Sequence, residues 1–251
     1  MEAINDCCKA GHPQNAGRRT WLKAGVGAGA ASMMAAVTLV PRQADAASLT
    51  RAERDAMTPD QVIDMMKQGN ERFRTGKSQK HDYLAQKRSS ASGQFPAAVI
   101  LSCIDSRAPA EIILDAGIGD TFNGRVAGNI ANDDLLGSME FACAAAGAKV
   151  VLVMGHTACG AVAGAIDNVE LGNLTGLLKV IRPAVDATQY SGERSGKNAE
   201  FVDAVAKTNV QHTIDAIRKN SPILAGLEKE GKIKIVGSMY DLSNGMVTFL
   251  G

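Results

Sequence analysis

Residues 149–155 read Lys-Val-Val-Leu-Val-Met-Gly, and this stretch decides the fold class of the chain. The apolar block is continuous, with no alternation between apolar and polar residues. A strand covered on both faces has this pattern, because none of its side chains faces water. Strands of that kind belong to parallel sheets with helices on both sides. We therefore expect an α/β domain built around this strand.

The segments on either side of this strand extend the same pattern. Further apolar runs predict strands at 97–103, 121–127, 233–240 and 246–250. Apolar residues at helical spacing predict helices at 58–74, 83–89, 135–146, 159–166, 170–190 and 198–220, with a helical turn at 109–114. Strands that alternate with helices predict a mainly parallel central sheet of four to five strands, flanked by helices. We expect residues 48–94 to form an N-terminal helical arm and residues 95–251 a single α/β domain.

Composition and charge narrow the class of protein. The chain has 251 residues, of which 45% are hydrophobic and 21% charged, which is enough apolar sequence for a sizeable globular core. The net charge is +1, and no stretch forms a basic stripe. Because nucleic-acid binding needs a concentration of Lys and Arg, we expect no nucleic-acid partner.

The first 47 residues have the pattern of an export signal. Arg18 and Arg19 precede the uncharged run 24–40, and small residues follow at Ala44 and Ala46. A basic region, an apolar region and a small-residue site predict a signal peptide that is cleaved. The paired arginines resemble a twin-arginine signal, so we expect a periplasmic or otherwise exported protein without stable membrane insertion. An uncleaved anchor is the alternative, because about 17 apolar residues reach the lower limit of a membrane span.

Three cysteines follow this segment, namely Cys103, Cys143 and Cys159. An odd number of scattered cysteines is a poor basis for disulfides, so metal binding or burial explains them better. Cys143 lies in an Ala-rich helical pattern, which favours simple burial. The isolated His81 and His212 are expected to be ordinary surface or core residues.

The other two cysteines stand where predicted strands end. Cys103 ends the strand at 97–103, while His156 and Cys159 follow the strand at 149–155. Ligands of open α/β sheets bind beyond the carboxyl ends of the strands, where neighbouring strands would bring these three residues together. Two thiolates and one imidazole with an open fourth position are typical of catalytic zinc, and they favour zinc over magnesium or calcium. We expect one Zn²⁺ per chain.

Several motifs resemble those of the β-class carbonic anhydrases in order and spacing, across about residues 95–250. The matching stretches are SCIDSR (102–107), RVAGN (125–129), GHTACGAV (155–162) and YDLSNG (240–245). The resemblance implies that Cys103, His156 and Cys159 bind zinc, and that Asp105 and Arg107 form the family's carboxylate–guanidinium dyad.

The resemblance also implies further contacts and an assembly. Gln94 stands where many members place a Gln that hydrogen-bonds substrate, and Phe122 where an aromatic residue lines the pocket. Phe141 stands where some members carry Tyr, so an apolar wall without the hydroxyl is expected there. A homodimer or tetramer is implied.

The resemblance implies reversible hydration of carbon dioxide to bicarbonate and a proton through zinc-bound hydroxide. Asp105 would accept a hydrogen bond from that hydroxide, and Arg107 would keep Asp105 ionised. In some members this Asp is instead the fourth zinc ligand of an inactive state, and the sequence leaves the two arrangements open. Two other functions also stay open: a hydrolase of CS₂ or COS on the same fold, and a zinc- or bicarbonate-binding protein without turnover.

Overall fold

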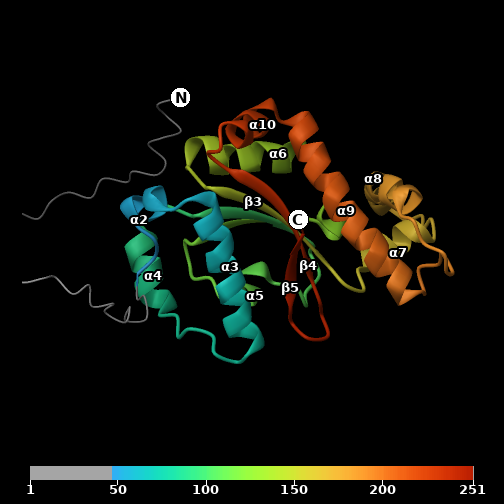
Figure 1. Ribbon diagram of the computed structural model, residues 1–251, viewed down its shortest axis with the longest axis horizontal. Helices are drawn as coiled ribbons and strands as arrows, with labels where there is room; N and C mark the ends of the chain where they lie inside the picture. The colour runs from blue at the N-terminus through green and yellow to red at the C-terminus, as the bar shows by residue number, and fades with distance from the viewer. Residues whose placement is uncertain (1–46, 251) are drawn as a thin grey trace, which may run out of the picture.

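A single five-stranded sheet forms the centre of the molecule in the computed structural model, which describes residues 47–250 (Figure 1). The strand order is β2-β1-β3-β4-β5, and every neighbouring pair is parallel except β4 and β5. The prediction of a mainly parallel α/β sheet is therefore confirmed. The predicted signal peptide lies outside the described residues, apart from Ala47. Within residues 47–250, no helix is long and apolar enough to cross a membrane.

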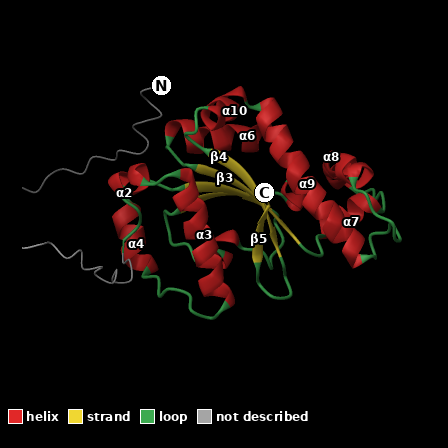
Figure 2. Ribbon diagram, in the orientation of Figure 1, coloured by secondary structure: helices red, strands yellow, loops and turns green. Residues whose placement is uncertain are grey.

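The strands lie at the centre of the molecule with helices around them, as Figure 2 shows by colour. The strands are β1 Ala98–Ser102, β2 Thr121–Arg125, β3 Val150–His156, β4 Lys234–Tyr240 and β5 Val247–Leu250. The helices before β3 are α2 Arg51–Ala56, α3 Pro59–Arg74, α4 Tyr83–Ser90, α5 Ala110–Ile113, the 3₁₀ turn η1 Ala127–Asn129, α6 Asp133–Glu140 and the π-helix η2 Phe141–Ala145. The helices after β3 are α7 Gly160–Ile166, α8 Gly172–Ala187, α9 Ala199–Asn220 and α10 Pro222–Lys229.

Both faces of the sheet are covered, as the unbroken apolar run of β3 predicts. Ile100, Leu152 and Met154 belong to a buried cluster on the face that α3 and α5 cover. Alternate residues such as Val151 and Val153 face the opposite cluster, which includes residues of α6, η2, α9 and α10. A third cluster joins α7, α8 and α9 beside the carboxyl ends of the strands, where Cys103 and Cys159 lie.

The N-terminal segment is tied to this core through α3. Val62, Ile63 and Met66 of α3 belong to the same buried cluster as β1 and β3. The Asn70 side chain donates to the Gly245 carbonyl at 2.9 Å and accepts the Val247 amide at 2.8 Å. Helix α3 thus completes one face of the domain and fixes the start of β5.

The predicted helix at 135–146 differs from the structure in its first residue and in the type of its last turn. It begins at Asp133, because the Asn132 side chain accepts the Leu135 amide and caps the first turn. From Phe141 onward the helix widens to a π-helix, and the Ala146 amide bonds the Phe141 carbonyl five residues back. Apolar periodicity does not distinguish a π turn from an α turn over so few residues.

The predicted helix at 170–190 is shorter, since α8 ends at Ala187. The Arg194 guanidinium donates to the carbonyls of Val185 and Thr188 at 2.7 and 2.8 Å, which satisfies acceptors that the helix end leaves free. Two short helices were not predicted. The Thr50–Glu53 capping box starts α2, and Ser221 caps α10 with Pro222 at its first position, so both had local signals.

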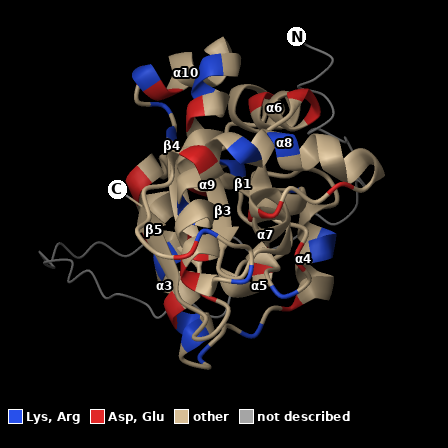
Figure 3. Ribbon diagram, turned by 90° about the vertical axis from the view of Figure 1, so that its right-hand side faces the viewer, with Lys and Arg blue, Asp and Glu red and all other residues tan. Residues whose placement is uncertain are grey.

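Lys and Arg positions alternate with Asp and Glu positions along the ribbon in Figure 3, without a region of one sign. One exposed network ties α9 to its neighbours. The Arg218 guanidinium on α9 bonds both carboxylate oxygens of Glu228 on α10 at 2.8 and 2.9 Å. The same two side chains bond the backbone of Ile235 on β4, so three elements meet at this ion pair.

Candidate metal centre

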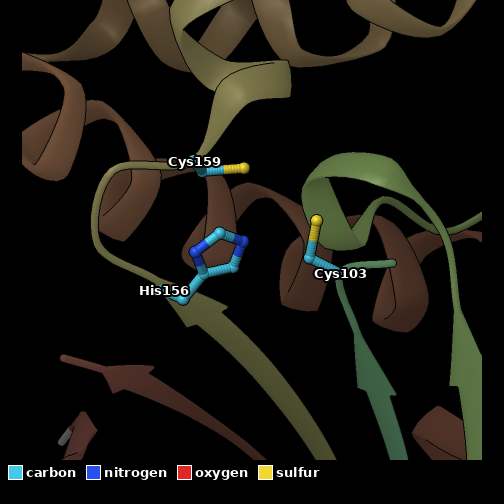
Figure 4. A group of neighbouring side chains, drawn as sticks. All are labelled: Cys103, His156 and Cys159. Atoms are coloured by element: carbon cyan, nitrogen blue, oxygen red, sulfur yellow. The ribbon is translucent and has the colours of Figure 1, made fainter. Parts of the chain in front are cut away.

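Cys103, His156 and Cys159 meet at the carboxyl ends of two neighbouring strands. Cys103 directly follows β1, and His156 is the last residue of β3, with Cys159 three residues further on. Their ligand atoms all lie within 4.8 Å of one another. Figure 4 shows the two sulfurs and the imidazole pointing into a common space. The three side chains are 4%, 1% and 1% exposed, so the structure brings together the predicted ligands in a buried cluster.

The chemistry of this donor set fits zinc. His156 Nδ1 lies 2.8 Å from the Thr157 carbonyl oxygen. Because a carbonyl can only accept, Nδ1 carries the proton and donates it to this bond. That tautomer leaves a lone pair on Nε2, which is buried and has no hydrogen-bond partner. A buried acceptor without a partner is costly, unless it serves as a ligand. Two sulfurs and one imidazole with an open position match a catalytic zinc site.

The two thiols titrate against each other. The neighbouring Cys159 thiol, opposed by burial and aided by His156 and the Gly128 amide, lowers the pKa of Cys103 to about 4. The Gly128 N–H donates to the Cys103 sulfur at 3.4 Å. The hydrogen bond between the Cys159 thiol and Cys103, together with burial, in turn raises the pKa of Cys159. A bound divalent cation would remove this conflict, because it stabilises both sulfurs as thiolates.

Asp105 and Arg107 form the predicted dyad beside the cluster. The Arg107 guanidinium donates through Nε and one terminal nitrogen to the two carboxylate oxygens of Asp105, at 3.0 and 2.8 Å. The Arg107 backbone amide adds a third bond at 2.9 Å. The Arg107 guanidinium therefore holds the pKa of Asp105 well below its usual range. Asp105 Oδ2 lies 3.9 Å from His156 Nε2, so the carboxylate stands next to the open side of the donor set.

Arg125 is a residue of this site that received no role from the sequence. Its guanidinium donates to the backbone carbonyls of Cys103 at 2.8 Å and Asp105 at 2.6 Å. These bonds fix the loop that carries both side chains. Arg125 is the last residue of β2 and pairs in register with Ser102 at the end of β1. The sequence signal that could have found Arg125 is a basic residue at the carboxyl end of the neighbouring parallel strand.

The predicted substrate contacts do not reach the cluster within one chain. Phe122 pairs with Val99, four residues before Cys103, which places it about 13 Å back along the sheet. Phe141 packs edge-on against Phe122, with ring centroids 6.0 Å apart. Gln94 is exposed and precedes β1. The roles of Gln94, Phe122 and Phe141 in substrate binding stay predictions.

The remaining cysteine and histidines lie apart from the cluster. Cys143 is buried in η2, where burial raises the pKa of its thiol to about 12. His81 lies 3.2 Å from an oxygen of Asp115, which also pairs with Arg72, and this contact secures the segment between α3 and α4. His212 is half-buried on α9 and does not belong to the group of three ligand residues.

A buried Cys₂His donor set beside an ordered carboxylate, at the carboxyl edge of a parallel sheet, is the arrangement of an α/β metalloenzyme. The sequence pattern of the carbonic anhydrase family matches residues 98–247. The chain belongs to the β-class carbonic anhydrase family and is therefore an enzyme of the lyase class.

Individual relatives agree with this. The chain is similar to carbonic anhydrase 2 of Mycobacterium tuberculosis, with 36% identity over 184 residues, which cover 72% of this chain and 87% of that protein. Among solved structures it is similar to the β-carbonic anhydrase CafA of Aspergillus fumigatus, with 32% identity, a TM-score of 0.59 and coverage of 65% and 79%. It is also similar to a tetrameric β-carbonic anhydrase of Sordaria macrospora, with 28% identity, a TM-score of 0.57 and coverage of 64% and 83%.

Proposed function

We propose that this chain catalyses the zinc-dependent, reversible hydration of carbon dioxide to bicarbonate and a proton. Family membership supports the reaction. The observation that carries the proposal is the position of Asp105, which is bound by Arg107 and lies 3.9 Å from the free ring nitrogen of His156. A carboxylate held in that place can orient a water molecule at the fourth position of the donor set.

Cys103, His156 and Cys159 would hold the zinc, one ion per chain. A zinc ion there lowers the pKa of water towards about 7 and so supplies hydroxide at neutral pH. Asp105 would accept a hydrogen bond from a water molecule at the fourth position of the donor set and so orient that water towards carbon dioxide. Arg107 fixes the plane of the Asp105 carboxylate and keeps it ionised.

The structure bears on which arrangement Asp105 adopts. Three hydrogen bonds hold Asp105 to Arg107, and both carboxylate oxygens take part. A carboxylate engaged in this way is turned towards the guanidinium, which supports water over Asp105 as the fourth ligand. We therefore take the arrangement seen here as the active one.

Stopped-flow measurement of carbon dioxide hydration tests the proposal. The zinc-loaded chain should accelerate hydration well above buffer, and Asp105→Ala should lower kcat by about 10²–10⁴-fold, the usual range for an acid–base group. A parent protein that holds one zinc per chain and hydrates no faster than buffer contradicts the proposal. Turnover of CS₂ or COS by that protein would identify the hydrolase alternative, and no turnover of either would identify the binding protein.

We also propose that two copies of the chain pair along β2. This strand is at the edge of the sheet, and its free backbone groups can pair with another strand. Beside it lies a groove of about 680 Å³, lined by Phe122, Phe141 and residues of α6. A second copy seated there would bring Phe122 and Phe141 towards a site other than their own. The similar Sordaria protein is tetrameric.

Finally, we propose export by the twin-arginine route, followed by removal of residues 1–47. The proposal rests on Arg18, Arg19 and the apolar run behind them. Changing Arg18→Lys together with Arg19→Lys should keep the protein in the cytoplasm, as fractionation of the cells measures. Unchanged export of this double variant contradicts the route.

A further inference from the structure

Helix α9 holds two segments beside the metal ligands: the loop between His156 and Cys159, and the turn η1, whose Gly128 amide bonds the Cys103 sulfur. We infer that Asp203 and Asn209 of α9 are positioning residues, which together fix the spacing between Cys103 and the His156–Cys159 loop. This inference rests on the proposed zinc site, and it assigns roles to two side chains that touch neither the ligands nor the substrate. Asp203 acts on the loop that carries His156 and Cys159, and Asn209 acts on the turn beside Cys103.

The first anchor holds the loop between His156 and Cys159. The Ala158 amide donates to the Asp203 carboxylate at 2.7 Å. Ala158 has a φ of +51°, a left-handed conformation that residues with a Cβ rarely adopt. Such a conformation persists only where surrounding contacts enforce it. Asp203 supplies that contact at the residue directly before Cys159, and so directs the Cys159 sulfur.

The second anchor acts on Cys103. The Asn209 side chain is 2% exposed and donates to the Gly128 carbonyl at 2.7 Å. Gly128 lies in the turn η1 with a φ of +70°. The Gly128 amide donates to the Cys103 sulfur at 3.4 Å. Asn209 thus holds Gly128, the residue whose amide donates to the Cys103 sulfur.

Helix α9 is a suitable common support. It spans 22 residues. Its buried face packs against β3 in the hydrophobic cluster of Val151 and Val153, and also in the hydrophobic cluster that contains Cys103 and Cys159. A single helix that holds both the His156–Cys159 loop and the turn η1 can set the separation of the two sulfurs. Groups that orient metal ligands in this way typically change metal affinity by about 10–100-fold when they are removed.

Zinc affinity of the purified full chain, measured by competition with a chromophoric chelator, tests the inference without any use of activity. Asp203→Ala and Asn209→Leu should each weaken zinc binding by about 10–100-fold. With Co²⁺ in place of zinc, both variants should also show shifted visible absorption bands, because these bands report the geometry of the ligands. Asp203→Asn keeps an oxygen that can accept the Ala158 amide, so it should retain more affinity than Asp203→Ala.

Two controls separate positioning from general destabilisation. Asp215→Ala makes the same change on the exposed side of α9, and Ile217→Ala weakens the core under α9 away from the cluster. Both should keep parental zinc affinity and cobalt bands. A second test looks for recovery rather than loss of zinc affinity. Adding Ala158→Gly to Asp203→Ala should recover part of the zinc affinity, since glycine adopts the left-handed conformation freely.

The outcomes are distinct. If Asp203→Ala and Asn209→Leu bind zinc within twofold of the parent, with unchanged cobalt bands, the inference is wrong. If Asn209→Leu does not fold, the result for Asp203→Ala against its controls decides. A parent that binds zinc but does not hydrate carbon dioxide overturns the proposed function alone, whereas a parent that binds no zinc overturns both.

Discussion

Arg107 sets the pH range in which the Asp105 carboxylate is ionised. Arg107 is exposed, yet its fork of donors takes both carboxylate oxygens of the less exposed Asp105. Because the guanidinium favours the charged form, the pKa of Asp105 stays well below its usual range. The carboxylate is therefore ionised throughout the pH range in which the enzyme would work.

Removal of Arg107 should expose this dependence. We predict that Arg107→Met lowers hydration activity by about 10–100-fold, as is typical for groups that orient residues of a metal site. The pKa of Asp105 should rise towards its ordinary value near 3.9. The acid-side fall in activity should therefore begin at a higher pH than in the parent. A pH profile of hydration measures this shift. Arg88→Met on the exposed face of α4 is the matched control, and an unchanged profile in Arg107→Met contradicts the account.

The residues of the site could be predicted from the sequence only where the signal is local. Cys103, Asp105 and Arg107 lie within five positions, and His156 and Cys159 within four, each group directly after an apolar strand. Asp203 and Asn209 gave no such signal, because their contacts span 45 and 81 residues and depend on where α9 crosses the loops.

Among the elements, α9, α10 and β4 are joined by the Arg218–Glu228 ion pair. The Arg218 guanidinium lowers the pKa of Glu228, so the pair stabilises the fold fully above the ordinary Glu pKa. This contribution is lost as the pH falls through the lowered pKa of Glu228. Both side chains are partly exposed, at 40% and 26%, so solvent weakens the interaction.

We predict that Arg218→Met lowers the free energy of unfolding by about 0.5–1 kcal/mol at pH 7, near the upper end for exposed pairs. The difference from the parent should shrink as the pH falls through the lowered pKa of Glu228. Urea unfolding at several pH values measures it. Lys229→Met, a nearby cation on α10, serves as control, and a difference that grows towards acid pH contradicts the assigned cause.

The elements themselves were largely predictable, since a strand buried on both faces is mostly apolar and an amphipathic helix shows apolar residues at helical spacing. The run at 149–155 predicted β3 and with it the parallel sheet. The π-helix η2 was not predictable, because it differs from an α-helix by one extra residue per turn rather than by composition.

For the whole molecule, the open edge of β2 is the feature that a single chain leaves unexplained. Phe122 and Phe141 line the groove beside that edge, away from the cluster of their own chain. We predict that Phe122→Glu converts the assembly to single chains, because a charge in this groove opposes burial against a second copy. Sedimentation velocity measures the mass. Asn123→Asp, the neighbouring position on the same strand, is the control, and a parent that sediments as one chain contradicts the pairing.

The account depends most on a single zinc ion bound by Cys103, His156 and Cys159. X-ray absorption at the zinc edge of the purified protein tests this directly. We predict one zinc per chain, with two sulfur neighbours at about 2.3 Å and a nitrogen neighbour at about 2.0–2.1 Å, and the loss of one sulfur or of the zinc in Cys159→Ser. A zinc surrounded only by oxygen and nitrogen, or a protein purified in zinc-containing medium that holds none, would contradict it.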